Sequence, residues 1–225
     1  MQENGKQHPE SLAETRQKLG MAALSLLASH PLSALDREMV AAVAETDAAL
    51  ARRLFPDCAS MALAGLGMLD DQLLQSLAQD VEDDSTATTR EILLEGLVQR
   101  FEGYTPHKDA IRNLNTAAMQ NPPLAACLVA SLNRAMAGML ETAGGTAPGI
   151  IGMLRIKGLS GVALICLRDW LKDDTPDLAA TQKAVDQRLG QAESLGLSLG
   201  IIRQQTAAET TTEDQKEEWQ DDRNT

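Results

Sequence analysis

The chain has 225 residues, of which 44% are hydrophobic and only 2% aromatic, and it carries a formal net charge of −12. This length allows one large domain or two small ones, each with a hydrophobic core. The polar first 20 residues argue against a signal or transit peptide, and no run of 18 apolar residues predicts a transmembrane helix. We therefore expect a soluble cytoplasmic protein.

The cysteines give no indication of a disulfide framework. There are three, Cys58, Cys127 and Cys166, in apolar surroundings and without a CxxC motif. An odd number in such contexts predicts buried free thiols in a reducing cytosol.

The amino-terminal residues 11–57 predict three helices, after a disordered segment 1–10. "SLAE" (11–14) is a capping box that begins a helix ending before Pro31, and "SALD" (33–36) predicts the start of a second. A short helix then follows Asp47 and ends near Phe55. Three helices of these lengths with one tight turn are typical of a helix-turn-helix module.

The rest of the chain also predicts helices and no convincing strand. "TTRE" (88–91) is a third capping box, and Pro176 suits a first helical turn. The expected helices cover about 58–79, 88–101, 107–119, 124–142, 149–172 and 176–193, with a weak one at 195–205. The fold class is all-α, with a helical ligand-binding and dimerisation domain over 58–205. Residues 206–225 hold seven acids and two bases and are expected to be a disordered tail.

The short helix after Asp47 raises the question of DNA binding. Residues 1–57 contain six bases and eight acids, whereas DNA affinity depends largely on neutralised phosphates. Thr46 is the candidate for base contact, and Arg52 and Arg53 are candidates for phosphate contact. Glu45 replaces the glycine typical of the turn and would face phosphate unfavourably.

The apolar, Met-rich stretch 124–167 is a candidate pocket for an apolar ligand. Pockets in helical domains lie between bundle helices, and methionine gives them an adaptable lining. Arg155 and Lys157 are candidates for an anionic head group, and 144–154 would form a flexible mouth. The alternative is an ordinary bundle core. The candidate lining residues are Leu132, Met136, Met139, Ile151, Leu154, Leu159 and Val162.

Trp170 has two interpretations. It stands among Arg168, Asp169 and Lys172, so it is either an exposed aromatic that binds a partner protein or an anchor of the core. A homodimer formed through the last two long helices would use the same region.

Catalytic and metal-binding patterns are absent from the sequence. No two His or Cys residues stand at metal-ligand spacing, and no phosphate loop, dinucleotide fingerprint or serine elbow occurs. We expect neither an enzyme nor a cofactor.

Several stretches together resemble known families. Three amino-terminal helices that end in "LFPD" (54–57), followed by a larger helical domain, look like TetR-family regulators. Within that fold, "REILLEGLVQRFEGYTPHKDAIRNL" (90–114), "NPPLAACLVASLNRAMAGML" (121–140) and "GLSGVALICLRDWLKDDTPDLAATQKAVDQRLGQAE" (158–193) resemble the TetR-like accessory proteins of ubiquinone biosynthesis, the Coq-nine family.

The resemblance implies a protein that binds a lipid or isoprenoid in an apolar pocket and presents it to a partner enzyme. The chain departs from the family where "GGTAPGIIGMLRIK" (144–157) replaces an acidic, Tyr-rich segment. The family's carboxy-terminal amphipathic helix, which contacts membranes, is reduced to "SLGLSLGIIRQQ" (194–205). The sequence thus favours a lipid-binding accessory protein, with a ligand-responsive DNA-binding regulator as the alternative and a scaffold without ligand or DNA as a third possibility.

Overall fold

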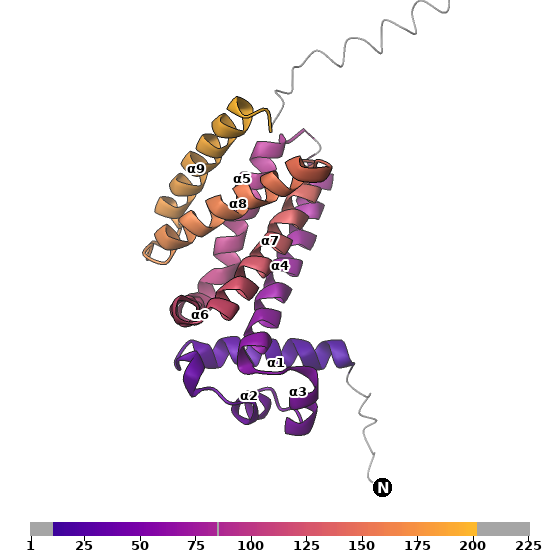
Figure 1. Cartoon of the computed structure of the whole chain (residues 1–225), viewed down its shortest axis with the longest axis vertical. Coiled ribbons are helices and arrows are strands. Elements are labelled where there is room, and N and C mark those ends of the chain that lie inside the picture. Colours follow the sequence, from indigo (N-terminus) through magenta and orange to yellow (C-terminus); the bar gives the residue numbers. More distant parts are fainter. Residues whose placement is uncertain (1–10, 85, 202–225) are drawn as a thin grey trace, which may run out of the picture.

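The computed structural model describes residues 11–84 and 86–201, and within them every regular element is a helix. Helices α1 to α3 lie at one end of the elongated molecule, and the carboxy-terminal end of α9 lies toward the other (Figure 1). The expected all-α fold is confirmed. The expectations for 1–10 and 206–225 lie outside the described residues.

The amino-terminal helices begin at side-chain caps. In α1 (Leu12–Leu27), Ser11 accepts a bond from the Glu14 amide at 3.2 Å, and the Glu14 carboxylate accepts one from the Ser11 amide at 2.8 Å. The prediction for α2 (Arg37–Val43) was displaced, because Leu32–Ala34 form a 3-10 turn and Asp36 is the cap. Asp47 caps α3 (Ala48–Leu54), as predicted.

Helix α4 (Cys58–Asp83) joins the amino-terminal helices to the rest of the bundle. It packs along α1, and the two backbones nearly touch where Gly20 faces Gly65. A Cβ atom added at Gly20 would lie 2.7 Å from the Gly65 nitrogen. Only glycine at both positions permits this approach. Helix α4 also continues past its predicted end near residue 79 to Asp83, so the linker between α4 and the next helix, which begins at Thr89, is short.

Five further helices complete the bundle. Thr88 caps α5 with the expected capping box, α7 packs against α4, α6 and α8, and α9 packs against α8 and α5. Helix α9 begins three residues after Pro176, because Leu178 adopts a left-handed conformation (φ 48°). The helices are α5 (Thr89–Tyr104), α6 (Lys108–Gln120), α7 (Pro122–Thr142), α8 (Gly149–Trp170) and α9 (Ala179–Ser198).

The separate weak helix expected at 195–205 is not seen in the described part of that range. Helix α9 continues without a break to Ser198 and ends in a turn at Gly200 (φ 67°). Residues 202–205 lie outside the described residues.

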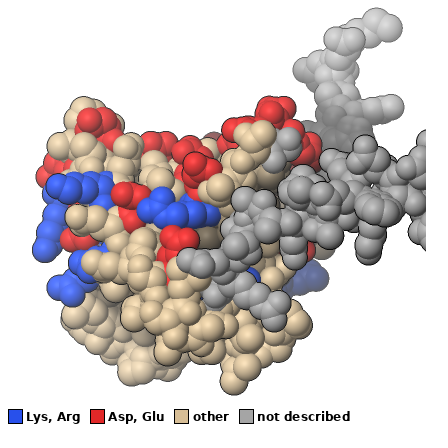
Figure 2. Space-filling model, turned by 90° about the horizontal axis from the view of Figure 1, so that it is seen from above, with Lys and Arg blue, Asp and Glu red and all other residues tan. Residues whose placement is uncertain are grey.

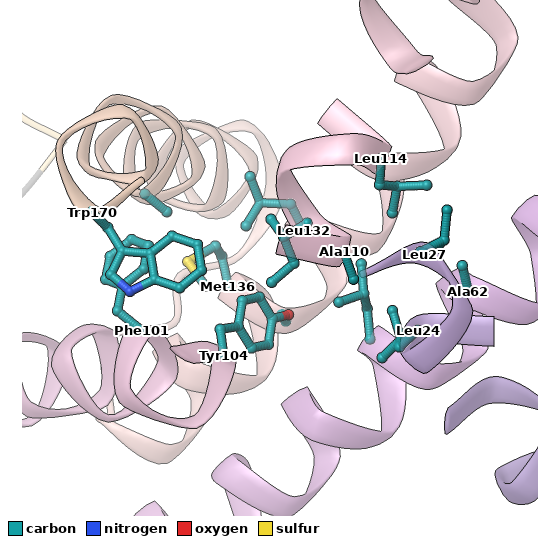
Figure 3. Close-up of a cluster of buried hydrophobic side chains, with 14 of the residues drawn as sticks. Leu24, Leu27, Ala62, Phe101, Tyr104, Ala110, Leu114, Leu132, Met136 and Trp170 are labelled. Carbon is teal, nitrogen blue, oxygen red and sulfur yellow. The ribbon is translucent and has the colours of Figure 1, made fainter. Parts of the chain in front are cut away.

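One hydrophobic core runs from the carboxy-terminal helices to the amino-terminal module. In Figure 3, Trp170, Phe101 and Met136 lie at one side of this cluster, and Leu24 and Leu27 of α1 lie at the other. The core is built mainly from leucine and alanine. The module therefore shares its core with the larger domain.

Helices α7 and α8 are long and apolar enough to cross a membrane by length and composition, with mean hydropathies of 1.3 and 1.8 in their most apolar windows. Core helices of soluble proteins can have the same length and composition, and both helices contribute side chains to the core. Helix α8 also exposes apolar side chains. In the view of Figure 2, charged side chains gather in one half and a broad uncharged area fills the other.

Candidate functional site

The outer face of α3 is the candidate DNA-binding surface. It exposes Ala49, Arg52 and Arg53. Arg52 forms an ion pair with Glu38 of α2, and both side chains are about half exposed (51% and 50%). Thr46 is half-buried, and its hydroxyl donates to the Ala44 carbonyl at 3.1 Å. The first turn of α3 therefore offers few groups for base contact.

Other bases of the module are held by contacts within it. Arg16 donates to the Leu54 carbonyl at 3.2 Å and lies over the Phe55 ring at 4.9 Å, and Arg37 donates to the Pro56 carbonyl at 3.0 Å. Arg53 is exposed and has no ion-pair partner among the described residues. Phosphate contact at this surface would rest first on Arg53.

Glu45 occupies the turn before α3 in a left-handed conformation, with φ of 51°. Glu45→Gly is expected to raise the free energy of unfolding by roughly 0.5–1 kcal/mol, because glycine adopts this conformation without a Cβ clash. Chemical denaturation measures the change. Glu45→Ala is the control, since it removes the charge and keeps the Cβ atom. Equal stabilisation by both variants would contradict a backbone cause.

The seven candidate pocket residues separate into two groups. Five of them belong to the single buried core, each at most 8% exposed: Leu132, Met136, Met139, Leu159 and Val162. Ile151 and Leu154 are 39% and 42% exposed and lie on the outer surface of α8. The structure therefore does not gather all seven around one cavity.

The two candidate head-group residues, Arg155 and Lys157, differ in their contacts with the rest of the protein. Arg155 donates to the Gly145 carbonyl at 2.8 Å and to the Ile201 carbonyl at 2.8 and 3.1 Å. It thus ties the loop between α7 and α8 to the end of α9. Lys157 is exposed. The segment expected to be a flexible mouth is held at Gly145 by this contact.

Trp170 is a core residue, in agreement with the second of its two interpretations and against an exposed partner-binding side chain. Its side chain is 0% exposed. The ring packs against Phe101 with centroids 5.6 Å apart, and the Lys108 Nζ atom lies 5.6 Å from its centroid. Within residues 11–84 and 86–201, the indole Nε1–H has no hydrogen-bond acceptor. A buried donor without a partner is uncommon in folded proteins.

The cysteines are free, but only two of the three are buried. Burial raises the pKa of the Cys166 thiol to about 11 and also raises that of Cys58. Cys127 is exposed, contrary to the expectation from its apolar neighbours.

A buried polar cluster lies between α4 and α5. The Asp70 carboxylate accepts bonds from Arg100 Nε at 2.8 Å and from the Tyr104 hydroxyl at 2.7 Å, with a longer bond from Arg100 Nη2 at 3.3 Å. Arg100 Nη2 also donates to the Tyr104 oxygen at 2.8 Å. The three residues are 5–8% exposed, and burial raises the pKa of Tyr104 above its usual range.

Sequence reasoning missed this cluster, although a signal was present. Arg100 and Tyr104 stand four residues apart on the same helical face as Leu97 and Phe101, which are buried. A charged residue on the face of a helix that packs into the core indicates a buried ion pair. Its partner, Asp70, is 30 residues away and could not be identified from helical spacing.

A small hollow opens between α4 and α7, next to this cluster. Its volume is about 30 Å³. It is too small for a lipid. Its walls are Gly67, Asp70, Asp71, Leu74, Ser131, Arg134 and Ala135.

A second buried carboxylate, Asp173, holds the connection between α8 and α9. Asp173 accepts bonds from the Thr181 amide and hydroxyl at 2.8 Å, and from the Thr175 hydroxyl at 2.6 Å. Its own carbonyl accepts a bond from Lys108 of α6. These contacts fix the start of α9 beside Trp170. The hydrogen bond from the Thr175 hydroxyl is the largest cause of a pKa well below the usual range for Asp173.

This lowered pKa predicts a pH-dependent stability. The carboxylate stabilises the fold above the pKa of an unfolded aspartate, about 3.9, and this stabilisation is lost as the pH falls from there toward the native pKa. Asp173→Asn is therefore expected to flatten the fall in stability below about pH 4, measured by denaturation at several pH values. Asp174→Asn, at a side chain 90% exposed, is the control. Parallel profiles for wild type and Asp173→Asn would contradict the assignment.

No group of three or more His, Cys, Asp or Glu side chains that could hold a metal ion is found among the residues the structure describes. The two buried polar groupings found here, around Asp70 and Asp173, are satisfied by internal hydrogen bonds. These clusters are suited to holding helices together.

Comparisons with known proteins identify the architecture. No protein-family model matches the sequence, and no curated protein is significantly similar to it. Solved structures do match. A TetR transcriptional regulator from Nitrosomonas europaea ATCC 19718 has a TM-score of 0.64 at 13% identity, over 80% of this chain and 98% of that one.

Two further structures agree with this match. A TetR transcriptional regulator from Rhodococcus sp. RHA1 has a TM-score of 0.55 at 16% identity, over 80% of this chain and 95% of that one. Thermus thermophilus FadR, a TetR-family repressor in complex with lauroyl-CoA, has a TM-score of 0.53 at 16% identity, over 86% and 98% of the two chains. Nothing in these matches points to the ubiquinone-biosynthesis family. The chain has the fold of TetR-family transcriptional regulators.

Proposed function

We propose that the protein is a ligand-responsive DNA-binding regulator that acts as a soluble cytoplasmic homodimer. The observation that carries this proposal is the continuity of α4. Gly65 of α4 contacts Gly20 of the module, and Asp70, five residues further along the same helix, joins the buried cluster of the larger domain. A change at Asp70 would therefore shift α1 and, with it, α3. Coupling of this kind between a ligand site and a DNA site is what defines an allosteric regulator.

The ligand would occupy the bundle core between α4, α5, α7 and α8. Methionines in this core can repack around a ligand, so Met136 and Met139, with Leu132, Leu159 and Val162, remain the proposed lining. One structural neighbour is a repressor bound to lauroyl-CoA, which supports an apolar or acyl ligand. Because the hollow between α4 and α7 is small, the core would have to open to admit the ligand.

The homodimer would form on the exposed face of α8. Gly158 and Gly161 lie there with open space beyond their Cα atoms, which permits a second helix to cross closely. Apolar side chains flank them at both ends, and a two-fold axis here would place two copies of α3 at one end of the dimer. The flanking residues are Ile150, Ile151, Met153, Leu154, Leu164 and Ile165, each 39–68% exposed.

Binding to a fluorescent mixed-sequence duplex tests the DNA-binding role. Wild-type protein is expected to bind at 50 mM salt and to weaken about 10-fold or more by 200 mM, because binding releases counterions from phosphates. The double variant Arg52→Glu/Arg53→Glu should lose this binding. Lys183→Glu/Arg188→Glu on α9 is the matched control, since it makes the same change in net charge far from α3. Equal binding by both double variants would refute the proposed interface.

A second candidate is the lipid-binding accessory protein that the sequence resemblance implies. It is favoured by the poor chemistry of α3, where Glu38 neutralises Arg52 and Glu45 occupies the turn. This candidate predicts about one isoprenoid per protein chain in organic extracts of fresh protein, together with no duplex binding at low salt. Extracts free of isoprenoid would argue against it.

A further inference from the structure

We infer that the ligand carries a carboxylate, which binds Arg100 by displacing Asp70. This inference rests on the proposed regulatory function and names the chemical class of its ligand. Arg100 lies on α5, and its guanidinium donates hydrogen bonds to both carboxylate oxygens of Asp70 on the neighbouring helix α4. A guanidinium binds a carboxylate through two parallel hydrogen bonds. Asp70 thus occupies the position that a ligand carboxylate would take.

The two charged groups are similarly buried, with side chains 6% (Asp70) and 9% (Arg100) exposed, but they differ in their position relative to the hollow. Asp70 forms part of the wall of the hollow between α4 and α7, next to the exposed Asp71. Arg100 does not border the hollow. A small shift of α4 would let Asp70 reach solvent, whereas Arg100 would stay buried and still require an anion. A buried charge without a partner is strongly unfavourable, so the incoming group must be anionic rather than cationic.

Tyr104 would complete the anion site. Its hydroxyl donates to Asp70 at 2.7 Å, and it could donate in the same way to a ligand carboxylate. The core also holds the indole N–H of Trp170, which has no acceptor in the described part of the chain. Trp170 packs on Phe101, the residue next to Arg100 in α5. An oxygen-bearing ligand in this core would supply an acceptor that the protein itself lacks.

The exchange would release α4 from α5. In the absence of ligand, the Asp70–Arg100 pair joins these helices, and the Gly20–Gly65 contact joins α4 to the module. A ligand that binds Arg100 in place of Asp70 breaks the connection between α4 and α5. The Gly20–Gly65 contact between α4 and α1 remains. Helix α4 would then move together with α1. Binding of the ligand carboxylate would in this way change the position of α3.

Tryptophan fluorescence tests this inference directly. The chain has two tryptophans, Trp170 and Trp219, so Trp219→Phe leaves Trp170 as the only reporter. The probes are decanoate, decylamine and decanol, which share a ten-carbon chain and differ in the charge of the head group. Decanoate is expected to change the emission and raise the Tm, and decylamine and decanol are expected to bind at least about 10-fold more weakly.

Two variants locate the site. Asp70→Asn removes the competing anion and should bind decanoate about 10-fold more tightly than the parent protein. Asp70→Leu/Arg100→Met removes both charges, so it should remain folded and bind decanoate no better than decanol. Equal binding of decanoate and decanol by the parent protein, or unchanged selectivity in the double variant, would overturn the inference. Selectivity for decylamine would also overturn it.

Failure of the inference can be told apart from failure of the proposed function. The duplex-binding test uses no ligand and depends on Arg52 and Arg53, whereas the fluorescence test uses no DNA and depends on Arg100. A protein that binds DNA and ignores decanoate refutes only the inference. A protein that binds decanoate selectively and no DNA refutes the regulator, and the carboxylate site would then serve a different role.

Discussion

Arg100→Met is expected to lower the free energy of unfolding by about 3–5 kcal/mol, because it leaves the Asp70 carboxylate buried without its cationic partner. Both side chains of the pair are less than one tenth exposed, so solvent cannot replace the lost contact. The Tyr104 hydroxyl would remain as a neutral donor to Asp70 and offset only a small part of the loss. Urea or guanidinium denaturation measures the change.

The double variant Asp70→Leu/Arg100→Met is the control for this prediction. Replacing a buried ion pair by apolar side chains of similar volume is often neutral or stabilising, so its stability should lie within about 1–2 kcal/mol of wild type. A single variant that is as stable as the double variant would show that Asp70 reaches water in the native protein. The pair would then not hold α4 to α5.

Gly20→Ala is expected to destabilise the protein by about 3 kcal/mol, since overpacking at a tight contact forces the backbones apart. The added Cβ atom would lie 2.7 Å from the Gly65 nitrogen and 2.9 Å from its Cα atom. Neither backbone atom can move without shifting α1 or α4 as a whole. Gly65→Ala should behave alike, because its Cβ atom would meet the Gly20 carbonyl oxygen at 2.6 Å.

Gly67→Ala is the matched control on the same helix. Nothing lies within 4 Å of the Cβ atom that it would add, and alanine is favoured over glycine inside a helix by roughly 1 kcal/mol. Gly67→Ala should therefore be neutral or stabilising. If Gly20→Ala and Gly67→Ala had the same effect, the close approach of α1 and α4 would not be the connection on which the coupling depends.

Local signals in the sequence were sufficient to predict most helix starts. Ser11 and Thr88 with their glutamates, and Asp47 before α3, cap helices as expected, since these bonds form between residues three apart. The start of α2 was misplaced because Ser33 and Asp36 are both good caps. The chain uses Asp36, whose carboxylate accepts the Met39 amide at 2.7 Å.

The candidate sites were harder to predict because they depend on contacts between distant residues. Hydrophobic periodicity identified Met136 and Met139 as inward-facing, but it could not tell that Leu154 lies outside the core of the single chain. Trp170 was ambiguous because its charged neighbours in the sequence suggested exposure. In the structure it lies on the face of α8 that packs into the core. Asp70, Arg100 and Tyr104 meet only through the packing of α4 on α5, which no local pattern specifies.

Selection from random duplex fragments with the purified wild-type protein, followed by sequencing, tests whether this protein binds DNA. We predict enrichment of an inverted repeat, because a two-fold dimer places its two α3 helices on symmetric half-sites. The same enrichment should be lost with Arg52→Glu/Arg53→Glu and kept with Lys183→Glu/Arg188→Glu. No enriched sequence at low salt from a folded, dimeric protein would contradict DNA binding and leave the lipid-binding role as the better account.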